Sequence, residues 1–338
     1  MPMSLPNATL AGTTNCNQLA TQSITILGAG AIGQLIYHQL QAKPNPFEVN
    51  FISRDSDSAS LALTLTNIEG EITTLNAQFI GCNDYQQALS KSALLIVCVK
   101  AYQVASALNS VLPFLSSNAH ILLLHNGMGP HIDVISSLNG RGLSLGTTSQ
   151  GSLKMAQWHI QQTGAGLTQL GSLNGDVKTP PLSPLLKNIL LNSIKNSEWH
   201  ADILPLLWQK LAVNVAINPL TAIHQCANGE LAADKYRDII NCAVAELVEV
   251  AHADGINLSH AFLIERVYQV IALTANNLSS MHQDVCHQRK TEVNAINGFV
   301  VARGKALRID TPYNQQLLKQ IQQIEAKYLP PAPSSISQ

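Results

Sequence analysis

One line of polar side chains interrupts an otherwise apolar stretch between residues 201 and 228. Lys210, Asn214 and Asn218 follow one another at intervals of four residues, and in an α-helix each such step returns to within about 40° of the same face. The residues around them are mostly apolar, so the pattern predicts a buried helix with a single polar stripe. An ammonium group flanked by amides can present a proton donor to a small polar ligand.

A purely structural interpretation of Lys210 stays open at this point. The stem of the side chain could pack against its apolar neighbours while the ammonium reaches water. Leaving that charge buried and unpaired would cost free energy or shift its pKa. In this second interpretation Asn214 and Asn218 are simply solvated.

A glycine-rich loop follows the first apolar segment of the chain. The sequence SITIL at 23–27 precedes Gly28, Gly30 and Gly33, which are in the G-x-G-x-x-G register, and a helical pattern follows. In dinucleotide-binding folds the first glycine permits a tight turn, the second lets the pyrophosphate approach the backbone and the third allows close packing of the helix. A second strand, VNFIS, comes next at 49–53, and this context supports a cofactor loop. Its residues are Gly28, Ala29, Gly30, Ala31, Ile32 and Gly33.

The residue after that second strand indicates which cofactor binds. An NAD-binding domain usually has an acidic residue there for the ribose hydroxyls, but this chain has Arg54, which favours the 2′-phosphate of NADP. Asp55 and Asp57 follow directly and keep NAD open as an alternative. Arg54 could also be an ordinary exposed loop charge.

Two further apolar runs end in polar residues. ALLIVCVK ends at Lys100, and HILLLHNG ends with Asn126 and Gly127. Continuous apolar runs are typical of central parallel strands, and ligands of open α/β sheets bind at the carboxyl ends of such strands. Lys100 and Asn126 are therefore candidates for the cofactor cleft, although Asn-Gly is also a common turn sequence.

Composition and charge exclude several functional classes. With 20 Lys+Arg against 21 Asp+Glu the net charge is -1, and no basic stripe indicates a nucleic-acid partner. The six cysteines show no CxxC and the histidines no HExxH spacing, so we expect neither a disulfide framework nor a metal site. The absence of a long apolar run or a signal sequence predicts a cytoplasmic protein that does not bind a membrane.

The order of segments predicts two domains, as the length of 338 residues also suggests. Residues 23–200 should form an α/β Rossmann-type domain with a mostly parallel sheet and an antiparallel extension, and residues 201–328 an all-α domain. Residues 1–22 are expected to be a disordered leader and 329–338 a disordered tail.

Within these domains, periodicity predicts the individual elements. A hairpin should turn at 67–70, and antiparallel strands should lie within 149–175. In the second domain, three helices are expected besides the one within 201–228. They lie at 232–254, 261–278 and 284–303, and the last of them carries Glu292.

Five sequence blocks resemble the ketopantoate reductase family in the same order. They are GAGAIG, LLLHNGMG, WQKLAVNVAINPLTAIHQCANGEL, LSSMHQD and KTEVNAINGF, within residues 23–328. The resemblance implies a Rossmann-type domain followed by an all-helical domain. It also implies NADPH-dependent reduction of 2-dehydropantoate (ketopantoate) to (R)-pantoate in pantothenate and coenzyme A biosynthesis, by a monomer or homodimer.

The resemblance also implies residue roles. Lys210 corresponds to the general acid of the family. Glu292 corresponds to its glutamate, which takes part in catalysis and in binding both the substrate and the cofactor. The remaining substrate contacts fall on Asn126, Asn214, Asn218, Asn228 and Ser280, and those to the cofactor on residues 28–33, Arg54, Lys100 and Asn126. Ser279 and Ser280 could alternatively do no more than cap a helix.

The chemistry of the stripe agrees with these roles. Hydride transfer to a 2-oxo carbon leaves negative charge on its oxygen, and an ammonium directed there stabilises the charge and supplies the proton. Two alternatives stay open: a related dehydrogenase that acts on another small oxo or hydroxy acid, and a non-catalytic protein that senses NADPH. The second has no need of a proton donor.

Overall fold

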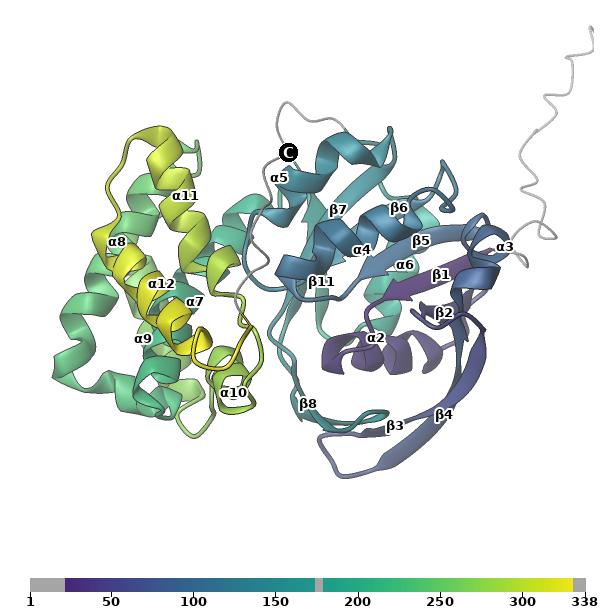
Figure 1. Ribbon diagram of the computed structural model, residues 1–338, viewed down its shortest axis with the longest axis horizontal. Helices are drawn as coiled ribbons and strands as arrows, with labels where there is room; N and C mark the ends of the chain where they lie inside the picture. The colour runs from purple at the N-terminus through teal and green to yellow at the C-terminus, as the bar shows by residue number, and fades with distance from the viewer. Residues whose placement is uncertain (1–21, 174–178, 331–338) are drawn as a thin grey trace, which may run out of the picture.

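The computed structural model describes residues 22–173 and 179–330. A sheet-bearing part comes first and a helical part follows (Figure 1). The leader and tail expected at 1–22 and 329–338 lie outside the described residues, apart from residues 22, 329 and 330.

The first part is built on one 11-stranded sheet. Its central strands β7, β6, β5, β1 and β2 run parallel to one another. All five are largely buried because helices cover both faces, as their continuous apolar sequences predict. Their bounds are β1 Ser23–Leu27, β2 Glu48–Ile52, β5 Ser92–Val97, β6 His120–Leu124 and β7 Gly142–Thr148.

Antiparallel strands extend this sheet, as predicted. The hairpin turns at 67–70, and a further antiparallel pair, β8 and β9, continues the sheet beyond β3. At the opposite edge β10 pairs antiparallel with β7, and β11 pairs parallel with β10. The bounds are β3 Ala59–Thr66, β4 Ile72–Ile80, β8 Gly151–Ala156, β9 His159–Gly164, β10 Thr168–Ser172 and β11 Ser197–His200.

The two faces of the sheet have separate apolar cores. On one face α2 (Ala31–Gln41) and α6 (Pro184–Ser193) pack against the strands, and the extended sheet curves around α2 (Figure 1). On the other face α3 (Tyr85–Leu89), α4 (Val104–Val111) and α5 (Pro130–Val134) pack, and their core continues into the helical part. The two parts of the molecule therefore share one apolar core at their junction.

The helical part is arranged around α7, Leu204–His224. This 21-residue helix contacts α8, α9, α10 and α12, which explains its apolar sequence on nearly every side. It ends where Gln225 adopts a left-handed φ of 50°, so Asn228 lies beyond it. The other helices are α8 Arg237–Ala253, α9 His260–Leu273, α10 Ser280–Cys286, α11 Asn297–Leu307 and α12 Pro312–Glu325. The 3-10 turns are η1 Cys82–Asp84, η2 Ala101–Gln103, η3 Ile135–Leu138, η4 Asn228–Ala232, η5 Asp234–Tyr236 and η6 Val293–Ala295.

The single helix predicted at 284–303 is wrong. The segment contains the end of α10, a loop, η6 and then α11, and Glu292 lies in the loop rather than on a helix. Gln288 has a φ of 52°, and the backbone N–H of Thr291 donates to the Glu325 carboxylate at 2.6 Å. A hydrogen bond to another helix thus replaces the local one that a continuous helix would need.

Candidate active site

Lys210 projects from α7 toward the first domain. Its Nζ donates to the carbonyl oxygen of Thr148 at 2.6 Å and to Oδ1 of Asn126 at 3.1 Å. Thr148 ends β7 and Asn126 follows β6, so both acceptors lie at the carboxyl edge of the sheet. The ammonium is therefore held in the junction between the two parts of the molecule.

Glu292 reaches the same place from the helical part. Its Oε1 accepts the backbone N–H of Ala101 at 3.0 Å, and its Oε2 lies 3.4 Å from both Lys100 Nζ and Asn126 Nδ2. The residue is only 6% exposed. Asn126 thus accepts from Lys210 with its oxygen and donates to Glu292 with its nitrogen, so one amide joins the two predicted catalytic residues.

The electrostatic surroundings settle the direction of the Lys210 shift. Burial lowers the pKa of Lys210 to about 8, and the Glu292 carboxylate opposes this by raising it. For Lys100, burial also acts to lower the pKa, but the carboxylates of Glu292 and Asp284 outweigh it, so the pKa of Lys100 is raised. At neutral pH both lysines are therefore cationic, and the pKa of Lys210 lies only slightly above that pH.

Three contributors to this cluster were missed from the sequence. Asp284 is 3% exposed, and its carboxylate binds Lys100 at 2.7 Å and Arg289 at 3.1 Å. The signal for Asp284 was its position four residues after Ser280, on the same face of α10. Ala101 and Thr148 contribute backbone atoms, and no pattern of side chains reveals those.

The glycine loop has the geometry that its register predicts. Gly28 has a φ of +116°, and a Cβ at Gly33 would lie 2.0 Å from the Gly28 carbonyl oxygen, so neither position accepts a side chain. A Cβ at Gly30 would meet nothing within 4 Å. Gly30 caps α2 without a side-chain hydrogen bond, and the first turn of α2 has no acidic residue. The open space before this helix N-terminus therefore fits an anionic pyrophosphate.

Arg54 follows β2, two residues after the strand ends at Ile52. The strand β2 is next to β1, which leads into the glycine loop. Arg54 is exposed, and within the described part of the chain its guanidinium forms no ion pair. It is therefore available to a ligand that passes along the strand ends.

The remaining predicted residues lie on neighbouring elements of the helical part. Asn214 and Asn218 continue the stripe along α7, and α10, which Ser280 begins, packs against α7. Ser279 rather than Ser280 caps α10, because its Oγ accepts the N–H of His282 at 3.1 Å. The Ser280 side chain is exposed and is left free for another role.

Asn228 begins η4, after α7 has ended. Its Nδ2 donates to Thr274 Oγ1 at 2.8 Å, while its Oδ1 is buried without a hydrogen-bond partner among the described residues. The amide is thus anchored at one end only.

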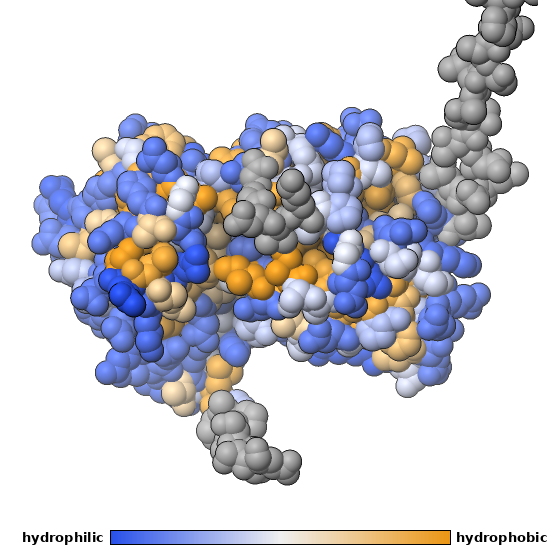
Figure 2. All heavy atoms as spheres, turned by 90° about the horizontal axis from the view of Figure 1, so that it is seen from above, coloured by the Kyte–Doolittle hydropathy of each residue, from blue (hydrophilic) through white to orange (hydrophobic). Residues whose placement is uncertain are grey.

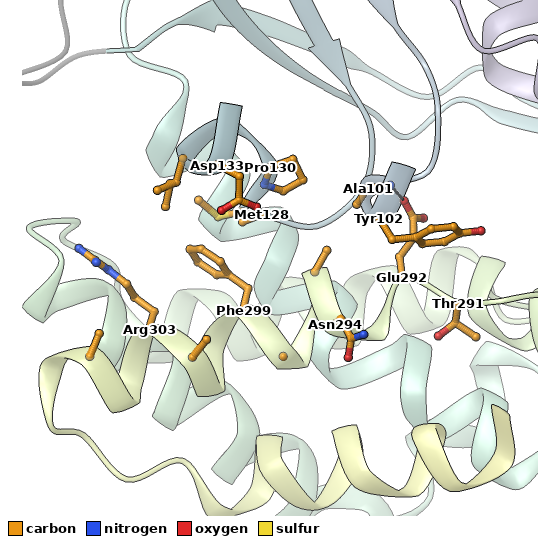
Figure 3. Close-up of a pocket in the computed structure, with 16 residues that line it drawn as sticks. Ala101, Tyr102, Met128, Pro130, Asp133, Thr291, Glu292, Asn294, Phe299 and Arg303 are labelled. Carbon is orange, nitrogen blue, oxygen red and sulfur yellow. Dashed lines mark hydrogen bonds between the residues drawn. The ribbon is translucent and has the colours of Figure 1, made fainter. Parts of the chain in front are cut away.

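A cavity of about 400 Å³ lies on one side of this cluster, between the loops after β5 and β6 and helix α11. Figure 3 shows Glu292 directed toward Ala101 and Tyr102 at one end, with Phe299 and Arg303 at the other. Figure 2 shows apolar side chains across the centre of one face, where the two parts meet. The cavity reaches Glu292, but Lys210 and Asn126 do not line it.

Two sequence profiles match most of the chain. The profile described as "Ketopantoate reductase PanE/ApbA" covers residues 24–175, and its C-terminal counterpart covers residues 202–325. The chain belongs to the ketopantoate reductase family. The resemblance drawn from the sequence blocks is thereby confirmed, and with it membership of a family of NAD(P)-dependent oxidoreductases that act on CH–OH groups.

Individual relatives agree with this assignment. A 2-dehydropantoate 2-reductase of Vibrio cholerae serotype O1 is 37% identical over 306 residues, which are 90% of this chain and 99% of the relative. The crystal structure of a PanE/ApbA family ketopantoate reductase from Ralstonia eutropha has a TM-score of 0.78 at 24% identity and covers 91% of this chain and 99% of its own.

A third relative has the same fold and a different name. A ternary structure of D-mandelate dehydrogenase with NADH and anilino(oxo)acetate has a TM-score of 0.80 at 23% identity, with the same coverage of 91% and 99%. At this identity the two solved structures establish the fold alone. They confirm the predicted class, a Rossmann-type sheet domain followed by helices.

No helix in residues 22–173 or 179–330 is long and apolar enough to cross a membrane.

Proposed function

We propose that this protein reduces 2-dehydropantoate to (R)-pantoate with NADPH, as a cytoplasmic step of pantothenate and coenzyme A biosynthesis. The observation that carries the proposal is the Lys210 ammonium, held by Asn126 and Thr148 at the domain junction with its pKa lowered to about 8. The domains would be residues 23–200 for the cofactor and 201–328 for the substrate.

Lys210 performs the acid step of the proposed reaction. When NADPH is bound it supplies the hydride, and the 2-oxo oxygen of the substrate then gains negative charge. The Lys210 ammonium stabilises that charge and gives its proton to the oxygen. A pKa of about 8 suits this role, because the group is protonated at neutral pH and still releases its proton readily.

The neighbouring residues orient the two ligands. Asn214, Asn218, Asn228 and Ser280 offer donors for the substrate carboxylate, and Glu292 offers an acceptor for its distal hydroxyl. The residues that would hold the cofactor are those whose environment accommodates an anion or a ribose: the loop 28–33, Arg54, Lys100, Asn126 and Glu292.

The proposal is tested by NADPH oxidation with ketopantoate as substrate. We expect turnover that depends on ketopantoate. Turnover should be much weaker with other 2-oxo acids of similar bulk and with the 2-oxo acid that corresponds to mandelate. Because a D-mandelate dehydrogenase shares the fold, the second candidate function is reduction of another 2-oxo acid. Turnover with such an acid in preference to ketopantoate would support that candidate, and NADPH binding without any turnover would support a sensor.

The pH dependence of kcat/KM should report Lys210. Reduction needs the protonated lysine, so the rate should fall roughly tenfold per pH unit above the pKa. That limb should begin near pH 8, because the pKa without ligands is about 8; the negative charge of bound NADPH acts to raise this pKa and the added burial acts to lower it. Assays from about pH 6 to about pH 10 at saturating NADPH check this. A profile that stays flat to the alkaline end would contradict the role of Lys210.

Replacing Arg54 should change the choice of cofactor. A charge-assisted contact with the 2′-phosphate is worth about 1.5 to 3 kcal/mol, so NADPH should be preferred over NADH by roughly 10 to 150-fold. Arg54→Ala should weaken NADPH binding by that factor and leave NADH nearly unchanged, as measured by the Kd of each. Arg266→Ala, an exposed arginine on α9, serves as control. An equal loss for both cofactors would show that Arg54 does not read the phosphate.

A further inference from the structure

Three glutamines form a buried polar cluster between α2 and the extended sheet. Gln39 on α2, Gln150 in the turn after β7 and Gln162 on β9 are each at most 6% exposed. Burying an amide costs free energy unless it is hydrogen-bonded, so three together in one place need an explanation. The roles assigned so far to cofactor and substrate residues do not include them.

Gln150 is the centre of the cluster. Its Oε1 accepts Nε2 of Gln39 at 2.7 Å and Nε2 of Gln162 at 3.3 Å. Because two donors meet its oxygen, its amide orientation is fixed, and Nε2 points the other way. There it donates to Thr168 Oγ1 at 2.9 Å and to the Lys195 carbonyl at 3.3 Å.

The bonds continue from Gln150 to Thr148 by two routes. The Thr168 and Thr148 hydroxyl oxygens lie 2.8 Å apart, and since Thr168 accepts from Gln150, its own proton is free to bind Thr148. The backbone N–H of Gln150 also donates to Thr148 Oγ1, at 3.1 Å. The side chain of Thr148 is therefore held by two donors, the backbone N–H of Gln150 and the Thr168 hydroxyl, and only the second is oriented by the Gln150 side chain.

Thr148 is also the residue whose carbonyl oxygen accepts the Lys210 ammonium at 2.6 Å. Fixing its side chain restrains the backbone at the end of β7, and hence the direction of that carbonyl. A carbonyl that accepts from an ammonium favours the charged form of the lysine.

We propose that Gln150 is a positioning residue for Lys210, acting through Thr168 and Thr148 to hold the carbonyl that orients the ammonium toward the substrate. The inference rests on the proposed function for its effect on turnover, but its effect on Lys210 itself is independent of any substrate. The titratable groups that face Lys210 in the described residues are Glu292 and His125, and neither contacts Gln150.

The test compares Gln150→Leu with Gln162→Leu. Both substitutions replace a buried glutamine of the same cluster by an apolar residue of similar size, but among the described residues the Gln162 side chain bonds to Gln150 and not to Thr148 or Thr168. For Gln150→Leu we expect kcat to fall roughly tenfold, the loss of about one hydrogen bond to a charged group. The Kd for NADPH should stay within about twofold of the unaltered protein, and Gln162→Leu should keep kcat within about twofold.

A second measurement needs no substrate. The 13Cε resonance of Lys210, assigned by its absence in Lys210→Ala, should titrate near pH 8 in the unaltered protein and at lower pH in Gln150→Leu, while Gln162→Leu leaves it in place. An unchanged titration in folded Gln150→Leu would overturn the proposal, as would equal effects of the two variants on both kcat and titration. Failure of the unaltered protein to reduce ketopantoate would overturn the proposed function alone, because the effect of Gln150→Leu on the Lys210 titration can still be measured without a substrate.

Discussion

Lys210→Ala should lower kcat by roughly 10² to 10⁴-fold while the Kd for NADPH stays within about twofold. The loss is large because one group supplies both the charge that stabilises the developing oxyanion and the proton that neutralises it. Cofactor binding should survive, because the glycine loop and Arg54 lie on the first domain, away from α7.

Both quantities should be measured on the same folded sample. Lys305→Ala is the matched control, since Lys305 is an exposed lysine on α11 and should keep normal turnover. If Lys210→Ala retained turnover within a few-fold of the unaltered protein, Lys210 would not be the general acid, and its bonds to Thr148 and Asn126 would be structural.

Glu292→Gln should give the second-largest effect, seen in the pH profile as well as in the rate. The substitution keeps the size of the side chain but removes the charge that raises the pKa of Lys210. The pKa of Lys210 should therefore fall below its present value of about 8, and the alkaline limb of kcat/KM should move to lower pH. Near pH 8 we expect kcat/KM to drop by roughly 10 to 100-fold.

Asp284→Asn is the matched comparison for Glu292. It removes another buried carboxylate from the same cluster, but one that contacts Lys100 and Arg289 rather than Asn126. We expect Asp284→Asn to leave the alkaline limb where it is. If both variants moved the limb equally, the effect would come from the total charge of the cluster, and Asn126 would have no special part in linking Glu292 to Lys210.

Features with a local physical cause could be predicted from the sequence. The helical stripe of Lys210, Asn214 and Asn218 follows from a period of 3.6 residues, and the glycine register follows from the steric demands of one turn. The strand ends at Lys100 and Asn126 follow from apolar runs that only a covered strand tolerates. The family resemblance added the roles proposed for Ser280, Asn228 and Glu292, which periodicity does not give.

The one helix predicted at 284–303 shows where local information ended. Its sequence is compatible with a helix, but the backbone of Thr291 bonds to Glu325 and the carboxylate of Glu292 bonds to Ala101. Both partners are distant in sequence, so these long-range hydrogen bonds determine the conformation of the segment and override its local helical propensity.

The chain alone thus determined which residue types would be available at the strand ends and on α7, because those depend on periods and turns of a few residues. Only the tertiary structure decided how they meet. Asn126 lies between Lys210 and Glu292 although 84 and 166 residues separate it from them. The direction of the Lys210 pKa shift depends on how burial, which lowers it, compares with the nearby carboxylate, which raises it. That balance is set by distances across the domain junction, and a one-dimensional pattern does not contain them.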